Sequence, residues 1–125
     1  MLKSLTKLLK AVTFITPLRY GSYDNVAYQS SEGTQKFRPL TGSHLGDSNQ
    51  AMEFTVVEVL FSIPYDKRIL GRVLDQITRV HIAEEPVVYI SETWVSRVKS
   101  YEDKSNPNRF WNRPEFEKGV KDSDK

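Results

Sequence analysis

Apolar residues recur at helical spacing in two stretches of the chain, and each stretch predicts an amphipathic helix. In residues 3–14, leucines and Val12 fall on one face with lysines opposite, and Pro17 ends the helix because proline disfavours helix in the residue before it. A second helix is predicted over residues 65–80. Pro64 opens it, and its apolar face is marked by Ile69, Val73, Ile77 and Val80.

Four other stretches have the β-branched and aromatic composition of strands. Residues 26–30 and 34–39 are short and separated by Ser-Glu-Gly, so we expect them to pair with each other as a hairpin. Residues 51–63 carry the strongest strand signal, and residues 87–95 alternate between two faces. A polar loop with two glycines, residues 41–50, separates the hairpin from the long strand.

The order helix, hairpin, long strand, helix, strand predicts an α+β domain over residues 1–97, with two helices on one face of an antiparallel sheet. This order is close to the ferredoxin-like βαββαβ plan, but the strand before the first helix is missing. Because that strand is central in the plan, we expect a truncated chain whose true start lies upstream, or a chain that is soluble only as an oligomer. Residues 98–125 are polar and irregular, and we expect a partly disordered tail.

The amino-acid composition excludes several kinds of functional site and partner. The 125 residues are enough for one domain with a core, and no apolar run reaches the roughly 18 residues of a transmembrane helix, so no membrane contact is expected. The absence of cysteine excludes disulfides, zinc–thiolate sites and cysteine nucleophiles, and fits a reducing, cytoplasmic setting. The formal net charge of +2 does not favour binding to nucleic-acid phosphates.

Basic residues dominate the N-terminus. Residues 1–23 contain three lysines and one arginine and no acidic residue. A basic amphipathic start resembles a mitochondrial transit peptide, and residues 1–20 would then direct the protein to mitochondria. The alternative, which we favour, is that residues 3–14 form a helix of the domain itself.

The segment VHIAEEPVVYIS, residues 80–91, places a histidine and two glutamates close together. His81, Glu84 and Glu85 could hold a divalent metal, because a catalytic site usually needs three protein ligands. Two other roles need no metal: a capped corner between the helix and the last strand, and contacts between subunits. We favour the corner and expect no catalytic residue, with His81 and Glu84 as the metal candidates.

A second candidate site surrounds the block FRPLTGS. Arg38 could grip an anion with help from backbone N–H groups around Gly42 and Ser43, because such loops can form anion-binding nests. Tyr23, Asp24 and Tyr28 could complete a pocket with a neighbouring subunit. The alternative, which we favour, is a hairpin end turned by Pro39 and Gly42, with Arg38 in a structural ion pair.

The tail carries the sequence Arg109-Phe110-Trp111-x-Arg113, a mixture of aromatic and basic residues that can stack on bases. The whole chain has 18 basic against 16 acidic residues, which does not favour a nucleic-acid partner. We expect the aromatic residues, including Phe116, to dock the tail or to bind a partner protein.

Three sequence blocks carry a resemblance to a known family: Gly21-x-Tyr23-Asp24, Gly33-x-x-x-Phe37-Arg38-Pro39-Leu40-x-Gly42-Ser43, and His81-x-x-Glu84-Glu85-Pro86. In this order and spacing they resemble, over about residues 3–96, the small domain inserted in YqfO-type proteins. That domain also occurs as a free-standing chain and is similar in fold to CutA and the PII regulators. The chain departs from the family at Ile82-Ala83, where Pro-Tyr is usual, and in its absent first strand.

The resemblance implies a non-enzymatic, oligomerising CutA/PII-like module, because the metal ligands of YqfO-type proteins belong to a separate domain whose motifs are absent here. Strands 51–63 and 87–95 are apolar on both faces, which predicts a second buried face and a homo-oligomer, with a trimer preferred. Small-ligand sensing is the other function implied. The alternatives are a metal-ion-binding or metal-dependent hydrolase accessory protein with a divalent metal as cofactor, and an adaptor that acts through its tail.

Overall fold

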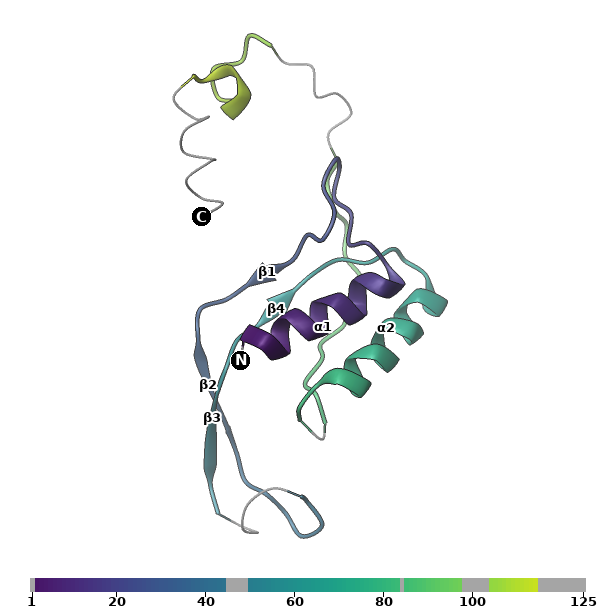
Figure 1. Cartoon of the computed structure of the whole chain (residues 1–125), viewed down its shortest axis with the longest axis vertical. Helices are drawn as coiled ribbons and strands as arrows, with labels where there is room; N and C mark the ends of the chain where they lie inside the picture. The colour runs from purple at the N-terminus through teal and green to yellow at the C-terminus, as the bar shows by residue number, and fades with distance from the viewer. Residues whose placement is uncertain (1, 45–49, 84, 98–103, 115–125) are drawn as a thin grey trace. The chain divides into compact units, whose positions relative to one another are not determined.

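The computed structural model of the chain describes residues 2–44, 50–83, 85–97 and 104–114 (Figure 1). The chain forms two compact units, Met1–Thr93 and Trp94–Lys125, and each is described by itself. Among the described residues the first unit contains two helices and two antiparallel two-stranded sheets, so the predicted α+β class is confirmed. The ferredoxin-like arrangement stays a prediction, and the predicted disorder of the tail concerns mainly residues outside the described ranges.

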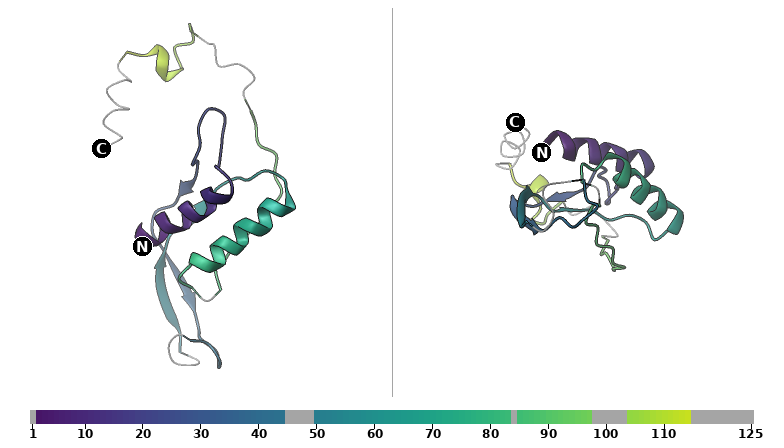
Figure 2. Two further views of the ribbon diagram at one scale, coloured as in Figure 1. Left: turned by 45° about the vertical axis from the view of Figure 1, so that its right-hand side comes forward. Right: turned by 90° about the horizontal axis from the view of Figure 1, so that it is seen from below.

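The two helices, α1 (Leu2–Ile15) and α2 (Lys67–Val80), pack side by side, as Figure 2 shows from two directions. Both helices were predicted from their apolar periodicity, and α2 begins two residues later than expected. Among the described residues, no helix has the length and apolar character needed to cross a membrane. The core that the helices enclose consists of Val12, Leu18, Val73 and Ile77, with Leu8, Ile15, Phe61, Ile63 and Ile69 partly buried around it.

Asp66, rather than Pro64, sets the start of α2. Its backbone is extended, and its carboxylate oxygen Oδ1 accepts hydrogen bonds from the N–H groups of Arg68 (2.8 Å) and Ile69 (3.3 Å). These bonds satisfy N–H groups that have no partner inside the helix, and the negative charge lies at the positive end of the helix dipole. The prediction that proline opens the helix is therefore wrong by two residues, because the capping side chain lies after the proline.

After α1 the chain reverses in a tight loop that continues the core. The helix is closed by a hydrogen bond from the Thr16 N–H to the Val12 carbonyl (3.0 Å), and Leu18 then turns into the core with a positive φ of 54° and only 2% of its surface exposed. Backbone bonds from Val26 to Leu18 (3.0 Å) and from Asn25 to Pro17 (2.8 Å) fix the returning arm. Burial of the leucine side chain offsets the cost of its left-handed backbone.

A long hairpin follows, and its pairing differs from the prediction. Its strands are β1 (Tyr28–Gln29), β2 (Gly33–Phe37), β3 (Met52–Val56) and β4 (Val59–Leu60), with β1 paired to β4 and β2 paired to β3, both antiparallel. The two short stretches expected to pair with each other thus lie along one arm of the hairpin. The predicted turn at Ser-Glu-Gly is wrong because Gly33 pairs with Val56 as part of β2.

A β-bulge joins the two ladders of the hairpin. Three residues, 30–32, separate β1 from β2, but only residues 57 and 58 separate β3 from β4, so the first arm contains one extra residue. Ser30 donates its N–H to the Glu58 carbonyl (2.9 Å), and its hydroxyl oxygen accepts the Glu58 N–H (2.8 Å). The side chain of Ser30 thus supplies the acceptor that the interrupted ladder lacks. The single long strand predicted over 51–63 is split at this point.

On one face of the hairpin, two aromatic side chains from neighbouring strands contact each other diagonally across the β2–β3 ladder. Phe37 and Phe54 stack edge to face with ring centroids 4.9 Å apart, and on the opposite face Lys36 lies 3.9 Å from the Glu53 carboxylate. Such cross-strand neighbours typically contribute roughly 0.2–1 kcal/mol, and the ion pair contributes least because both side chains are exposed. The outer hairpin is thus held mainly by its backbone ladder.

The strand predicted over residues 87–95 belongs to no ladder within the described residues. We call residues 86–93, which belong to the first unit, the final segment. The segment is extended and exposed: the exposed fraction of the side chain is 60% for Val87, 56% for Ile90 and 94% for Tyr89. Among the described residues, 86–91 make no backbone hydrogen bond, and the segment is tied to the unit by the Tyr65 hydroxyl, which donates to Glu92 Oε1 (3.0 Å). Within the described residues, β4 pairs with β1 and β2 pairs with β3, so the predicted strand has no ladder partner.

The N-cap of α2 generates a stability prediction. Asp66→Ala removes the acceptor of two helix N–H groups, and we expect it to lower the free energy of unfolding by about 1 kcal/mol. Asp75→Ala is the matched control, because Asp75 is exposed in the middle of the same helix, and its change should stay within about 0.5 kcal/mol. Urea denaturation measures both, and equal losses would contradict the capping role.

Candidate functional site

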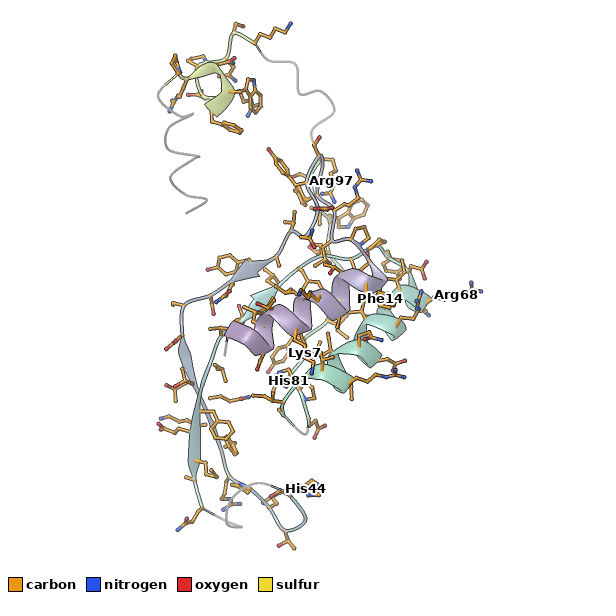
Figure 3. The ribbon with its side chains drawn as sticks, viewed as in Figure 1. Lys7, Phe14, His44, Arg68, His81 and Arg97 are labelled. Carbon is orange, nitrogen blue, oxygen red and sulfur yellow. The ribbon has the colours of Figure 1, made fainter. Side chains whose placement is uncertain are left out.

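The residues singled out in the sequence occupy three separate parts of the first unit. Tyr23 and Asp24 lie in the loop after α1, whereas Arg38, Gly42 and Ser43 follow β2 toward the far end of the hairpin. His81 and Glu85 follow the last turn of α2. Figure 3 shows this separation through its labels, with His44, the neighbour of Ser43, at the hairpin end and His81 beside the end of α2.

His81 forms the corner that ends α2. Its backbone N–H donates to the Ile77 carbonyl (2.9 Å), and its ring nitrogen Nδ1 accepts the N–H of Ala83 (3.0 Å). The first bond closes the helix and the second holds the turn that leaves it. This geometry agrees with the interpretation of the motif as a corner. It also commits Nδ1 as an acceptor, which leaves Nε2 as the nitrogen that carries the proton in the neutral ring.

A metal site at this corner gains no support from the described residues. They contain no group of three or more histidine, aspartate or glutamate side chains that could hold a metal ion. Glu84, the second metal candidate, lies outside the described residues, and Glu85 is exposed. Metal binding by His81 and Glu84 therefore stays a hypothesis.

The FRPLTGS block forms a turn at Gly42. The Ser43 N–H donates to the Leu40 carbonyl (3.1 Å), and Gly42 has a φ of +100° at the third position of this four-residue turn, which is the geometry that favours glycine. The Ser43 N–H is therefore already used within the turn, which agrees with the favoured hairpin end rather than with the alternative in which this group helps Arg38 to bind an anion. Arg38 is exposed two residues before Leu40.

Tyr23 and Asp24 are held by local contacts. The backbone groups of Tyr20 and Tyr23 bond to each other in both directions (2.8 and 3.1 Å), across a turn in which Gly21 has a φ of +62°. Asp24 Oδ1 accepts a hydrogen bond from the Asn25 side-chain amide (2.9 Å). Both candidate side chains are exposed, and these contacts account for the turn without a ligand.

The second unit contains a compact aromatic and basic cluster around the 3₁₀ helix η1 (Phe110–Asn112). Phe110 and Trp111 stack edge to face with centroids 5.2 Å apart, and the Arg109 guanidinium lies 5.9 Å from the Trp111 ring centre. Arg113 donates from Nε to the Pro107 carbonyl (2.6 Å). The predicted docking aromatics thus contact one another, whereas Phe116 lies outside the described residues.

Among the described residues, a surface hollow lies beside α1. None of the candidate residues identified in the sequence lines this hollow. The hydroxyl group of Thr13, one of its lining residues, already donates a hydrogen bond to the Leu9 carbonyl (2.9 Å). Sequence reasoning missed it because its members belong to no motif. They are Thr6, Leu9, Lys10, Thr13, Leu18 and Asn25.

The corner at His81 can be tested against a metal role. His81→Ala removes the acceptor for the Ala83 N–H, and we expect it to lower the free energy of unfolding by about 1 kcal/mol. His81→Asn should recover part of this loss, because an asparagine oxygen can accept the same bond. Thermal unfolding measures stability, and elemental analysis of the purified variants measures metal. Metal bound to the native chain and lost in both variants would contradict the structural role.

Comparison of the chain with protein-family models, with curated proteins and with solved structures found no match. The resemblance to the small YqfO-type domain therefore rests on the three sequence blocks alone and stays a prediction. What the geometry adds is that these blocks build a loop, a turn and a helix corner, each held by contacts within its own neighbourhood.

Proposed function

We propose that this chain is a non-enzymatic homo-oligomerisation module. The observation that carries the proposal is the final segment, an extended run with exposed valine, tyrosine and isoleucine side chains and with no backbone hydrogen bond from residues 86–91 among the described residues. An extended backbone with open N–H and C=O groups is a template to which another strand can add. Apolar side chains along that backbone would gain free energy on burial.

The size of the core supports the same conclusion. Four apolar residues are buried among the described ones, whereas many large apolar side chains are exposed, including Phe14 and Ile82 at more than four-fifths of their surface. Covering one valine or isoleucine side chain typically contributes roughly 1.5–3 kcal/mol, which is a substantial part of the ~5–15 kcal/mol that holds a domain together. Assembly is a direct way for this chain to bury more apolar surface.

The sequence resemblance points in the same direction, because it implies a CutA-like module that assembles through sheet edges, with a trimer as the preferred state. Small-ligand sensing is less well supported than assembly, since the candidate residues lie in three separate places and the hollow beside α1 contains none of them. No observation favours the metal-dependent alternative, and the aromatic cluster of the second unit is compatible with a protein partner.

The proposal predicts a concentration-dependent mass. Sedimentation equilibrium of the native chain at micromolar concentration should give a species larger than the 14.4 kDa monomer. Ile90→Lys should raise the dissociation constant at least about tenfold, because it places a charge in the surface that assembly would bury. The Ile90 side chain is already half exposed in the single chain, so the substitution should have little effect on the fold of the monomer.

Leu40→Lys is the matched control, because Leu40 is similarly exposed but lies near the hairpin end. It should leave the mass unchanged. A native chain that stays monomeric throughout the concentration range would contradict the proposal.

A further inference from the structure

Positive charge is concentrated on the exposed side of α2. Val73 and Ile77 mark the buried side of this helix, and Arg68, Arg72 and Arg79 lie on the opposite side, all exposed. Because the helix has about 3.6 residues per turn, the three arginines fall within about 40° of one another around its axis. We call these three residues the arginine stripe. Figure 3 shows Arg68 directed outward from the start of α2.

The arginine stripe has no negative partner among the described residues. No described ion pair or side-chain hydrogen bond involves one of its guanidinium groups, and Asp75 pairs with neither Arg72 nor Arg79. By sequence, α1 and α2 together contain seven basic residues and one acidic residue, Asp75. The net charge of +2 is therefore an average over a basic pair of helices and a remainder in which acidic residues predominate.

Several residues on this side of α2 weaken the helix. Lys67 and Arg68 lie in its first turn, where the positive end of the helix dipole disfavours cations. Gly71 is exposed in the helix interior, where glycine is less favourable than alanine, and a Cβ at this position would meet nothing within 4 Å. Packing within the described chain therefore does not require the glycine. A glycine does let a ligand approach the backbone closely, and local choices that weaken a fold are expected at functional sites.

The chemistry of this surface distinguishes between classes of anionic partner. The exposed positions of α2 carry charged or polar residues and one glycine, with no apolar side chain to enter a lipid layer or to anchor a protein interface. Interfaces with nucleic acid are more polar and more positively charged than interfaces between proteins. Arginine also matches phosphate geometry, because its planar fork donates two parallel hydrogen bonds to phosphate oxygens.

We propose that the arginine stripe is a docking surface for the phosphate backbone of nucleic acid, with Gly71 as the point of closest approach. Phosphates carry no sequence information, so this binding is independent of base sequence. The activity goes beyond homo-oligomerisation and does not depend on it, because all of its residues lie on one helix of a single chain.

Salt dependence tests the proposal with the full-length chain. Fluorescence anisotropy of labelled DNA and RNA duplexes of one mixed sequence gives the dissociation constant at several salt concentrations. The logarithm of the association constant should fall linearly with the logarithm of salt concentration, with a slope of about −3 for three phosphate contacts. Arg72→Gln should make this slope less steep by about one. Binding to one duplex alone identifies the nucleic acid, and binding to neither would overturn the proposal.

A charge-matched control locates the binding surface. Arg68→Gln combined with Arg72→Gln should raise the dissociation constant at least about tenfold. Arg19→Gln combined with Arg38→Gln removes the same charge from exposed positions outside the helices and should change it by no more than about twofold, because salt screens distant charges. Equal losses in the two double variants would show that binding follows total charge and would overturn the assignment to α2.

Two further variants separate docking from damage to the fold. Asp75→Asn removes the acidic charge beside the stripe and should tighten binding several-fold. Gly71→Leu should raise the urea midpoint, because leucine favours helix more than glycine does, and should still weaken binding by blocking close approach. Unchanged binding by a stable Gly71→Leu chain would overturn docking at this surface. Binding to phosphatidylserine vesicles but to neither duplex would replace nucleic acid with a lipid surface and overturn the proposal.

Discussion

The packing of α1 against α2 is the interaction on which the rest of the first unit depends. Val12 comes from α1, Val73 and Ile77 come from α2, and Leu18 closes the cluster from the loop between α1 and the hairpin. Among the described residues, Phe61 and Ile63, which lie between β4 and α2, are partly buried against this core. A small apolar contact between two helices therefore holds together the loop after α1, through Leu18, and the end of α2, through Ile77.

The sequence predictions are accurate where an interaction joins residues close together in the chain, and inaccurate where it joins residues far apart in the chain. The apolar faces of the helices depend on neighbours three and four residues apart, and Val73 and Ile77 are buried as their spacing predicts. Strand pairing joins residues far apart in the chain. The turn predicted at Gly33 is wrong, because local composition cannot reveal that Val56 lies opposite this residue. The start of α2 was missed for a different reason, since an aspartate cap outweighs a nearby proline.

The same distinction applies to the candidate site. The turn at Gly42 and the corner at His81 could be anticipated, because each is built from bonds between residues at most four positions apart. Whether the three sequence blocks meet in space could not be anticipated, since it depends on how the loop, hairpin and helix end are arranged around the core. The exposure of the final segment was equally hidden, because its alternating valines and isoleucine have the same composition as a paired strand.

The bulge at Ser30 also changes what each position of the first hairpin arm will tolerate. Gln29 and Gly33 are four residues apart, and in a regular strand they would share a face, but their partners Val59 and Val56 are three apart and face opposite ways. The extra residue therefore reverses the alternation along that arm. The odd-numbered positions before the bulge therefore share a face with the even-numbered positions after it. Substitutions should follow this change, so that the set of positions that tolerates a given type of residue switches between odd and even numbers at the bulge.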